Sequence, residues 1–267
     1  MIEAMRLARE IRFSLVPETL EGQRPINSWA GWPGTDALAP YLTLRATLTG
    51  PIDPSTGYLC NIKDIDALLR ERAVPLLQRS YHQGEHLSTA WLARACFDAC
   101  AAASPPGIEV VELRLAVTPY LNFEIRGNEL PMIRMTQSFE FSASHRLFCH
   151  ELSADDNRRR FGKCANPHGH GHNYIVEVTV AGSPDARTGS IVDLNTMERA
   201  VKEAVVERFD HKYLNLDCEE FAEINPTIEN ITRVIWDKLN GRLAPAQLVN
   251  VRVWETPKTY AEYAGAT

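Results

Sequence analysis

The stretch CANPHGHGHNYIVEVTV, residues 164–180, decides how this chain folds and where its chemistry is placed. Its second half alternates with period two and is rich in β-branched residues, which predicts a β-strand. Residues i and i+2 of a strand point to the same face, so we expect His170 and His172 to present their imidazoles to one point. Two imidazoles on a rigid strand make half of a tetrahedral zinc site, and the small glycines beside them let the backbone come close to a bound group.

The chain around this stretch is built as two copies of one unit. Gly50, Asp53, Thr56 and Gly57 recur 132 residues later as Gly182, Asp185, Thr188 and Gly189. In each copy this turn follows an alternating apolar strand and precedes an amphipathic helix, which we expect over residues 62–77 and 194–209. A second helix repeats at an offset of 139 residues and a closing strand at 138. We infer a tandem duplication; the alternative is two unrelated α+β domains with chance matches.

These repeats predict the fold class. Each copy contains strands and two helices, and hairpin connections between strands make a sheet antiparallel. We therefore predict an α+β protein with two tandem units, each a four-stranded antiparallel sheet with two helices on one face. A polar, turn-rich stretch at residues 126–131 separates a first domain, 1–128, from a second, 129–267.

The two copies differ in their reactive residues. The positions of His170, His172 and Glu255 are taken in the first copy by Leu38, Pro40 and Val117. The first copy has thus kept the strand and turn residues but lacks the polar set. We expect it to be a structural domain with no metal site, and we expect any chemistry to belong to the second copy.

Composition limits the partners and the compartment. The net charge of −6 gives no sign of a general affinity for nucleic acid or for anionic membranes, and the sequence contains no apolar run of spanning length. The six cysteines show no spacing typical of a disulfide framework. Free thiols, and hence a cytoplasmic protein, are the better interpretation.

Several spaced motifs of the second half resemble the 6-pyruvoyl tetrahydropterin synthase and 6-carboxytetrahydropterin synthase family, whose architecture is the tunnelling fold. The resemblance covers residues 133–267, and its motifs lie at 141–147, 153–157, 161–164, 169–174, 210–212, 226–230 and 254–256. It implies a zinc-dependent lyase that converts 7,8-dihydroneopterin triphosphate into 6-pyruvoyl tetrahydropterin and eliminates triphosphate. The six-residue step from Cys164 to His170 resembles the pyruvoyl type.

Two other functions stay open. The first is 6-carboxytetrahydropterin synthase, which acts on the same substrate on the route to deazapurines. The second is a non-catalytic pterin-binding or scaffold protein, because half of the chain already lacks the reactive set. Product analysis separates the first from the main hypothesis, and a metal assay with a turnover test separates the second.

The resemblance assigns roles to individual residues. His145, His170 and His172 would bind Zn²⁺, an arrangement of three histidines with an open position that is typical of catalytic zinc. Cys164, Asp210 and His211 would move protons on the substrate side chain. Pterin and phosphate contacts would come from Glu255, Thr227, Glu229 and Lys163.

Simpler interpretations exist for several of these residues. Cys164 could be a small buried thiol, and Asp210–His211 could be a pair at a helix end. Thr227 could cap a helix, with Glu229 in its first turn. The basic cluster Arg158–Arg160 could be a solvated loop instead of a counter-charge for triphosphate. Ile228 replaces a second threonine of the family, which removes one hydroxyl contact.

Open sheet edges predict an assembly. Four-stranded antiparallel units have exposed edge strands and are rarely stable alone, whereas closing several units into a barrel removes the edges. We therefore predict a homo-oligomeric β-barrel with pterin sites between neighbouring units and the first copies filling structural positions.

Overall fold

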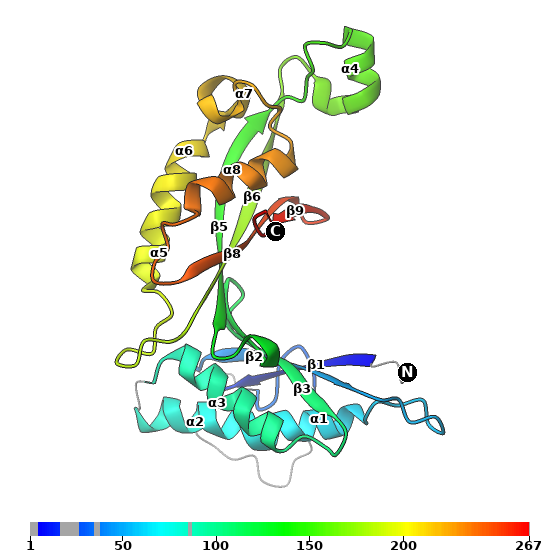
Figure 1. The fold of residues 1–267 in the computed structure, drawn as a ribbon, viewed down its shortest axis with the longest axis vertical. Coiled ribbons are helices and arrows are strands. Elements are labelled where there is room, and N and C mark those ends of the chain that lie inside the picture. Colours follow the sequence, from blue (N-terminus) through cyan, green and yellow to red (C-terminus); the bar gives the residue numbers. More distant parts are fainter. Residues whose placement is uncertain (1–4, 17–26, 35–37, 85–86, 267) are drawn as a thin grey trace. The chain divides into compact units, whose positions relative to one another are not determined.

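The structure is a computed structural model that describes residues 5–16, 27–34, 38–84 and 87–266. The chain forms two compact units (Figure 1). Unit 1 comprises Met1–Met135 together with Gly182–Ile191, and unit 2 comprises Thr136–Ala181 together with Val192–Thr267. No helix among the described residues is long and apolar enough to cross a membrane.

Unit 1 contains a four-stranded antiparallel sheet in the order of the chain. Its strands are β1 (Met5–Ser14), β2 (Tyr41–Gly50), β3 (Glu109–Thr118) and β4 (Leu121–Arg126). Helical structure runs without interruption through α1 (Ile62–Leu68), the π-helical turn η1 (Leu69–Ala73) and α2 (Val74–Gln83). After it comes α3 (Thr89–Ala102), which packs on β3 and β4. The first helical segment is therefore longer than the predicted 62–77.

The two faces of the unit 1 sheet are chemically different. Leu44, Leu113 and Ile125 are fully buried on the face that packs against the helices. The strand register brings charged residues of the other face into one row, made of Glu10, Arg45, Arg114 and Glu124. Because successive side chains of a strand alternate between faces, the apolar core lies on one side only.

Unit 2 repeats this architecture. Its sheet has the order β5 (Ile133–His145), β6 (His170–Gly182), β8 (Gln247–Thr256), β9 (Thr259–Tyr263), and β6, β8 and β9 pair antiparallel. One helical segment runs through α5 (Leu194–Val201), the π-helical turn η4 (Lys202–Val206) and α6 (Glu207–Phe209), which matches the predicted 194–209. The second long helix, α8 (Ile228–Leu239), packs on β8 and β9. The prediction of antiparallel sheets with helices is thus confirmed.

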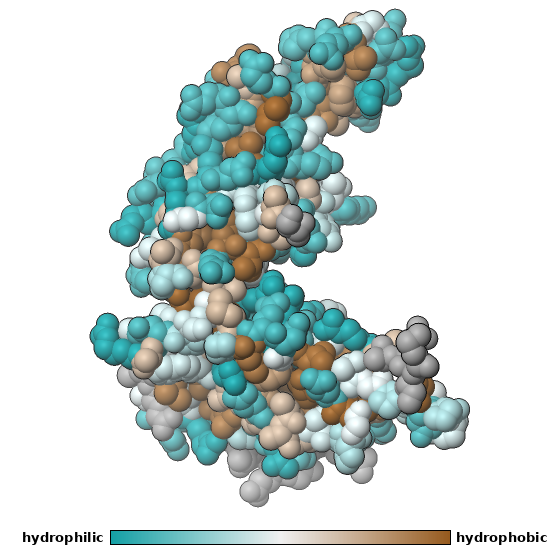
Figure 2. All heavy atoms as spheres, viewed as in Figure 1, coloured by the Kyte–Doolittle hydropathy of each residue, from teal (hydrophilic) through white to brown (hydrophobic). Residues whose placement is uncertain are grey.

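Three short elements of unit 2 were not predicted. Strand β7 (Lys212–Tyr213) pairs with β5 in parallel, an exception to the antiparallel pattern. Helix α7 (Leu214–Asp217) follows it. Helix α4 (Ala154–Phe161) contains Arg158–Arg160, so the interpretation of this basic cluster as a loop was wrong. The surface around α4 is mainly hydrophilic (Figure 2).

The same irregularities occur in both units. A register shift follows Thr47 in β2 and Thr179 in β6, at the offset of 132 residues found in the sequence. Each first helix contains a π-helical turn, η1 or η4. Side-chain caps begin the helices at Asn61 and Asp193, and at Ser88 and Thr227. These features are set by local sequence, so their recurrence at the repeat offsets extends the sequence match to backbone geometry.

The segment Gly182–Ile191 belongs to unit 1 although it follows β6 in the chain. The Ser88 hydroxyl donates a hydrogen bond to the Gly189 carbonyl oxygen over 2.7 Å. Gly189 has a φ of 69°, and a Cβ atom there would lie 2.3 Å from the Ser88 oxygen, so only glycine fits. The functional division into domains 1–128 and 129–267 stays a prediction.

Candidate metal centre and active site

Three histidines of unit 2 converge on one point. His145 ends β5, and His170 and His172 begin β6 on one face of that strand, as the sequence predicted. One ring nitrogen from each lies within 4.8 Å of the other two, a group that could hold a metal ion. The Nε2 atoms of His145 and His170 are 3.1 Å apart.

A hydrogen bond fixes the orientation of His145. Its Nδ1 atom lies 2.6 Å from the carbonyl oxygen of Pro226, just before α8. A carbonyl only accepts hydrogen bonds, so Nδ1 carries the proton and Nε2 presents its lone pair to the other histidines. Burial lowers the pKa of His145 to about 4, and the imidazoles of His170 and His172 contribute in the same direction. His145 is therefore neutral at physiological pH, the form that binds metals.

The remaining ring nitrogens also fit a metal ion. His170 Nδ1 and His172 Nε2 are buried and have no hydrogen-bond partner among the described residues. A buried polar atom without a partner costs about 1–3 kcal/mol, so its persistence indicates a missing ligand. Gly169 makes the close approach possible: its φ is 70°, and a Cβ atom there would lie 2.8 Å from the His145 carbonyl oxygen.

Glu255 lies beside the histidines. Its Oε1 atom is 3.5 Å from Nε2 of both His145 and His172. The pairing of β8 with β9 shifts between Trp254 and Thr256, and such an irregularity re-aims the side chain that it contains. The same shift occurs at Val117 of unit 1, where the side chain is apolar. The carboxylate is thus available to a polar ligand at the metal group.

Cys164 lies in a short 3-10 turn, Gly162–Ala165, and is half-buried. Its carbonyl oxygen accepts a hydrogen bond from Leu147 N over 2.9 Å, which ties the turn to the segment after His145. Burial raises the pKa of the Cys164 thiol, and the charge of Glu255 adds to the effect. The chain alone therefore favours the thiol, and the lowered pKa expected of a catalytic thiolate requires the charge of a cation.

Asp210 and His211 form the predicted pair between α6 and β7. Asp210 Oδ2 lies 2.8 Å from His211 Nδ1, and Asp210 Oδ1 accepts a hydrogen bond from Ser142 N over 2.8 Å. These two hydrogen bonds, that from Ser142 first, lower the pKa of Asp210. His211 has a φ of 56°, the one positive value at a non-glycine residue in the described chain, a strain that is common at functional sites.

The pair does not reach Cys164 within this chain. The His211 side chain is 83% exposed and lines an open pocket of about 640 Å³ together with Ser142, His172 and Asn173. No contact between Cys164 and either member of the pair is found among the described residues. The structure thus brings together the metal histidines, Glu255 and Cys164, and keeps the aspartate–histidine pair separate.

Thr227 caps helix α8. Its hydroxyl oxygen accepts a hydrogen bond from Asn230 N over 3.3 Å, which is the helix-cap interpretation of this residue. Glu229 lies in the first turn of the same helix. The cap holds the end of the helix next to Pro226, whose carbonyl binds His145.

A basic pocket of about 480 Å³ lies next to the Cys164 turn. Arg146, Arg158 and Lys163 line it, and no carboxylate does. The neighbouring Arg159 instead forms an ion pair with Asp156. Asn215 holds the backbone of Arg146 through both of its amide atoms. The cationic lining suits an anionic group that extends from the metal centre.

Sequence reasoning missed Tyr174. It lies on β6 two residues after His172, on the same face, and is fully buried. Burial raises the pKa of its hydroxyl, with contributions from Glu255 and Cys164. The period-two spacing from His172 was the signal that could have identified it.

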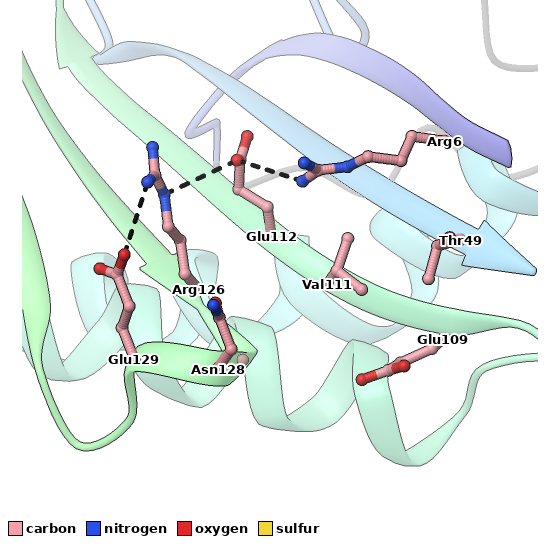
Figure 3. Close-up of a pocket in the computed structure, with 9 residues that line it drawn as sticks. Arg6, Thr49, Glu109, Val111, Glu112, Arg126, Asn128 and Glu129 are labelled. Atoms are coloured by element: carbon pink, nitrogen blue, oxygen red, sulfur yellow. Dashed lines mark hydrogen bonds and ion pairs between the residues drawn. The ribbon is translucent and has the colours of Figure 1, made fainter. Parts of the chain in front are cut away.

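Unit 1 contains a polar pocket of about 430 Å³ of a different kind (Figure 3). Glu112 lies between Arg6, at 3.7 Å, and Arg126, at 3.9 Å. Arg126 also reaches Glu129 at 3.5 Å. The charges of this pocket satisfy one another, so it does not indicate a ligand.

Comparison with known proteins assigns the second half of the chain. A family model described as 6-pyruvoyl tetrahydropterin synthase matches residues 134–266. Human 6-pyruvoyl tetrahydrobiopterin synthase is 42% identical over 139 residues, which are 52% of this chain and 96% of the human protein. The 6-carboxy-5,6,7,8-tetrahydropterin synthase of Rickettsia felis is 27% identical over 149 residues, covering 49% of this chain and 99% of that protein. The solved Caenorhabditis elegans 6-pyruvoyl tetrahydropterin synthase is 35% identical, with 51% and 97% coverage and a TM-score of 0.49.

Proposed function

The chain belongs to the 6-pyruvoyl tetrahydropterin synthase family, a family of lyases, and from this premise we propose that it converts 7,8-dihydroneopterin triphosphate into 6-pyruvoyl tetrahydropterin. The observation that carries the proposal is the convergence of His145, His170 and His172 beside Cys164 and Glu255. All five residues lie inside the stretch that matches the family.

We propose that the three histidines hold Zn²⁺. Imidazole nitrogens suit this borderline-soft ion, and His145 is neutral and correctly oriented for it. When bound, the ion supplies Lewis acidity that polarises the side-chain oxygens of the substrate. The unpartnered nitrogens of His170 and His172 support this assignment.

The protein residues would handle the protons and the pterin ring. Glu255 would accept two parallel N–H bonds from the ring, a bidentate contact that fixes its orientation. Cys164 would remove a proton from the side-chain carbon next to a hydroxyl group, and His211, oriented by Asp210, would transfer protons at neutral pH. The oxidation level then shifts from the side chain into the ring, triphosphate leaves by elimination, and no external redox cofactor is required.

Lys163 would provide counter-charge for the triphosphate, since it lies next to Cys164 and lines the basic pocket. The N-terminal end of α8, with Thr227 and Glu229, would meet the polar edge of the pterin ring. Because His211 is exposed and separate from Cys164, the proposal places the complete site between neighbouring chains of a homo-oligomer.

We further propose that the chain arose by tandem duplication and that its first copy is structural. The recurrence of register shifts, π-helical turns and helix caps at the repeat offsets supports the duplication. Leu38, Pro40 and Val117 at the positions of the reactive residues support the structural role. The six free cysteines support a cytoplasmic location.

A second candidate activity is 6-carboxytetrahydropterin synthesis from the same substrate. The similarity to the Rickettsia felis protein of that name favours it. The non-catalytic alternative is disfavoured by the complete reactive set of the second half.

One incubation tests these activities. The purified, zinc-loaded protein is mixed with 7,8-dihydroneopterin triphosphate, and the products are identified by mass spectrometry and by release of triphosphate. We expect 6-pyruvoyl tetrahydropterin; the carboxylated product would establish the second activity. Failure to consume the substrate, with metal content verified, would show that neither lyase reaction occurs. The His172→Ala variant is the control for activity from contaminants.

A further inference from the structure

The hydroxyl group of Tyr174 is buried without a partner. Tyr174 is 0% exposed, and its oxygen has no hydrogen bond to any described residue. Most buried polar side-chain atoms in folded proteins are satisfied, because desolvation without compensation is unfavourable. An exception in a well-packed strand next to a functional group indicates a partner that comes from outside the chain.

Packing fixes where this hydroxyl points. The Tyr174 ring stacks on Phe141 with a centroid distance of 5.0 Å and an interplanar angle of 22°. The ring of His172 lies 5.6 Å away on the other contact. A phenol oxygen lies on the ring axis, so ring flips do not move it, and the donor is held in one place before any ligand binds. This preorganisation is typical of a group that positions a ligand.

The surroundings of the hydroxyl are those of the candidate active site. Tyr174 shares a strand face with the metal histidines, and the charges of Glu255 and Cys164 both act on its phenol. The groups proposed to bind the pterin ring and to move protons therefore flank the unused donor.

We propose that the Tyr174 hydroxyl donates a hydrogen bond to an oxygen or nitrogen atom of the bound pterin substrate, between Cys164 and Glu255. The inference rests on the proposed function and adds a substrate-binding residue to it. A site built around such a donor discriminates against analogues that lack the acceptor, since the donor is then left unpaired.

Tyr174→Phe tests this proposal because it removes only the oxygen atom. We expect kcat/KM of the zinc-loaded variant to fall about tenfold to a hundredfold, the loss typical of one buried hydrogen bond to a ligand. The metal content should not change. The melting temperature should stay the same or rise, because phenylalanine leaves no unpaired polar atom in the strand. Tyr58→Phe, at a residue of unit 1 that is 61% exposed, is the matched control and should change neither quantity.

Three results would overturn the proposal. A lower melting temperature with unchanged kcat/KM would make the hydroxyl a structural group. No change in either quantity would mean that a buried water satisfies it. Loss of metal would mean that the residue acts through the histidines.

Binding of unphosphorylated 7,8-dihydroneopterin, measured by calorimetry, separates this proposal from the proposed function. If the wild-type protein binds this pterin about tenfold more tightly than Tyr174→Phe does but turns nothing over, the donor role holds and the lyase assignment fails. Equal binding by both proteins would refute the donor role whatever the turnover.

Discussion

At the residue scale, one hydrogen bond determines what His145 can do. The Pro226 carbonyl takes the Nδ1 proton and leaves the Nε2 lone pair facing His170. A histidine is a metal ligand only through an unprotonated nitrogen, so the second partner of the ring decides the first. Burial supports the same state by lowering the pKa of the residue to about 4.

Cys164→Ala should separate metal binding from proton transfer. The thiol is not among the three side chains that converge as metal ligands, so the variant should keep its metal content. Its turnover should fall about 100-fold to 10,000-fold, the usual contribution of a general base. Metal analysis and steady-state kinetics measure the two effects. Cys60→Ala, a half-buried thiol of unit 1, is the control; a normal rate in Cys164→Ala would remove the cysteine from the mechanism.

At the element scale, strand irregularities place the reactive side chains. The period-two geometry of β6 aligns His170, His172 and Tyr174, and the shift between Trp254 and Thr256 sets Glu255 beside them. The equivalent shift at Val117 in unit 1 shows that the backbone device exists without the carboxylate. Geometry and chemistry were therefore separable in this architecture.

An ion-pair group connects two helices of unit 2. Glu220 accepts a hydrogen bond from Arg208 of α6 over 2.8 Å and forms a second, shorter contact with Lys238 of α8. Burial by itself would raise the pKa of Glu220, but the hydrogen bonds from Arg208 and Lys238 outweigh burial and lower it to about 2. The charged carboxylate is thus more favourable in the folded state than in the unfolded state.

Glu220→Gln should therefore destabilise the protein in a pH-dependent way. A carboxylate with a lowered pKa stabilises the fold above its unfolded pKa, near 4.5, and loses this contribution as the pH falls toward 2. We expect a loss of about 2–3 kcal/mol at pH 7, measured by urea unfolding, that shrinks below pH 4.5. Glu219→Gln, which removes a carboxylate that is 87% exposed, should cost little. A difference between wild type and Glu220→Gln that is constant from pH 7 to pH 3 would contradict the charge-based explanation.

At the scale of the whole molecule, the open edges of the sheets determine assembly. Strand β1 is an edge of the unit 1 sheet and β9 an edge of the unit 2 sheet. Exposed edges carry unpaired N–H and C=O groups that favour pairing with other chains. Light scattering should give a mass that is an integral multiple of 30.0 kDa and greater than one chain. A monomeric mass at micromolar concentration would refute the barrel assembly and the shared active site.

Metal binding should stabilise the molecule as a whole. An ion that binds only the folded state adds about 2.7 kcal/mol at a concentration 100 times its Kd. Zn²⁺ should therefore raise the melting temperature of the metal-free protein, and EDTA should reverse the change. His172→Ala should respond little, because one of three ligands is missing. An equal shift in that variant would place the ion elsewhere.

Much of the fold was readable from the sequence because its signals are local. The helical segment 194–209 and strand β6 with its two histidines follow from periodicity alone. The first helix was predicted too short, since Pro75 suggested an end. The helix instead continues through a π-helical turn before Pro75 and stops at Gly84, whose φ is 66°. Helix α4 was missed because eight mostly polar residues carry little periodic signal.

The sequence by itself determined which residue types lie on which strand face, because the spacing of side chains along a strand is fixed by the backbone. That was enough to identify the metal histidines and to separate a reactive copy from an inert one. Only the tertiary structure decided that Pro226 orients His145, that Glu255 lies 3.5 Å from two imidazoles, that His211 is separate from Cys164 and that the Tyr174 hydroxyl is unpaired. These facts depend on contacts between residues distant in the chain, and such contacts are set by the packing of all elements together and leave no local pattern.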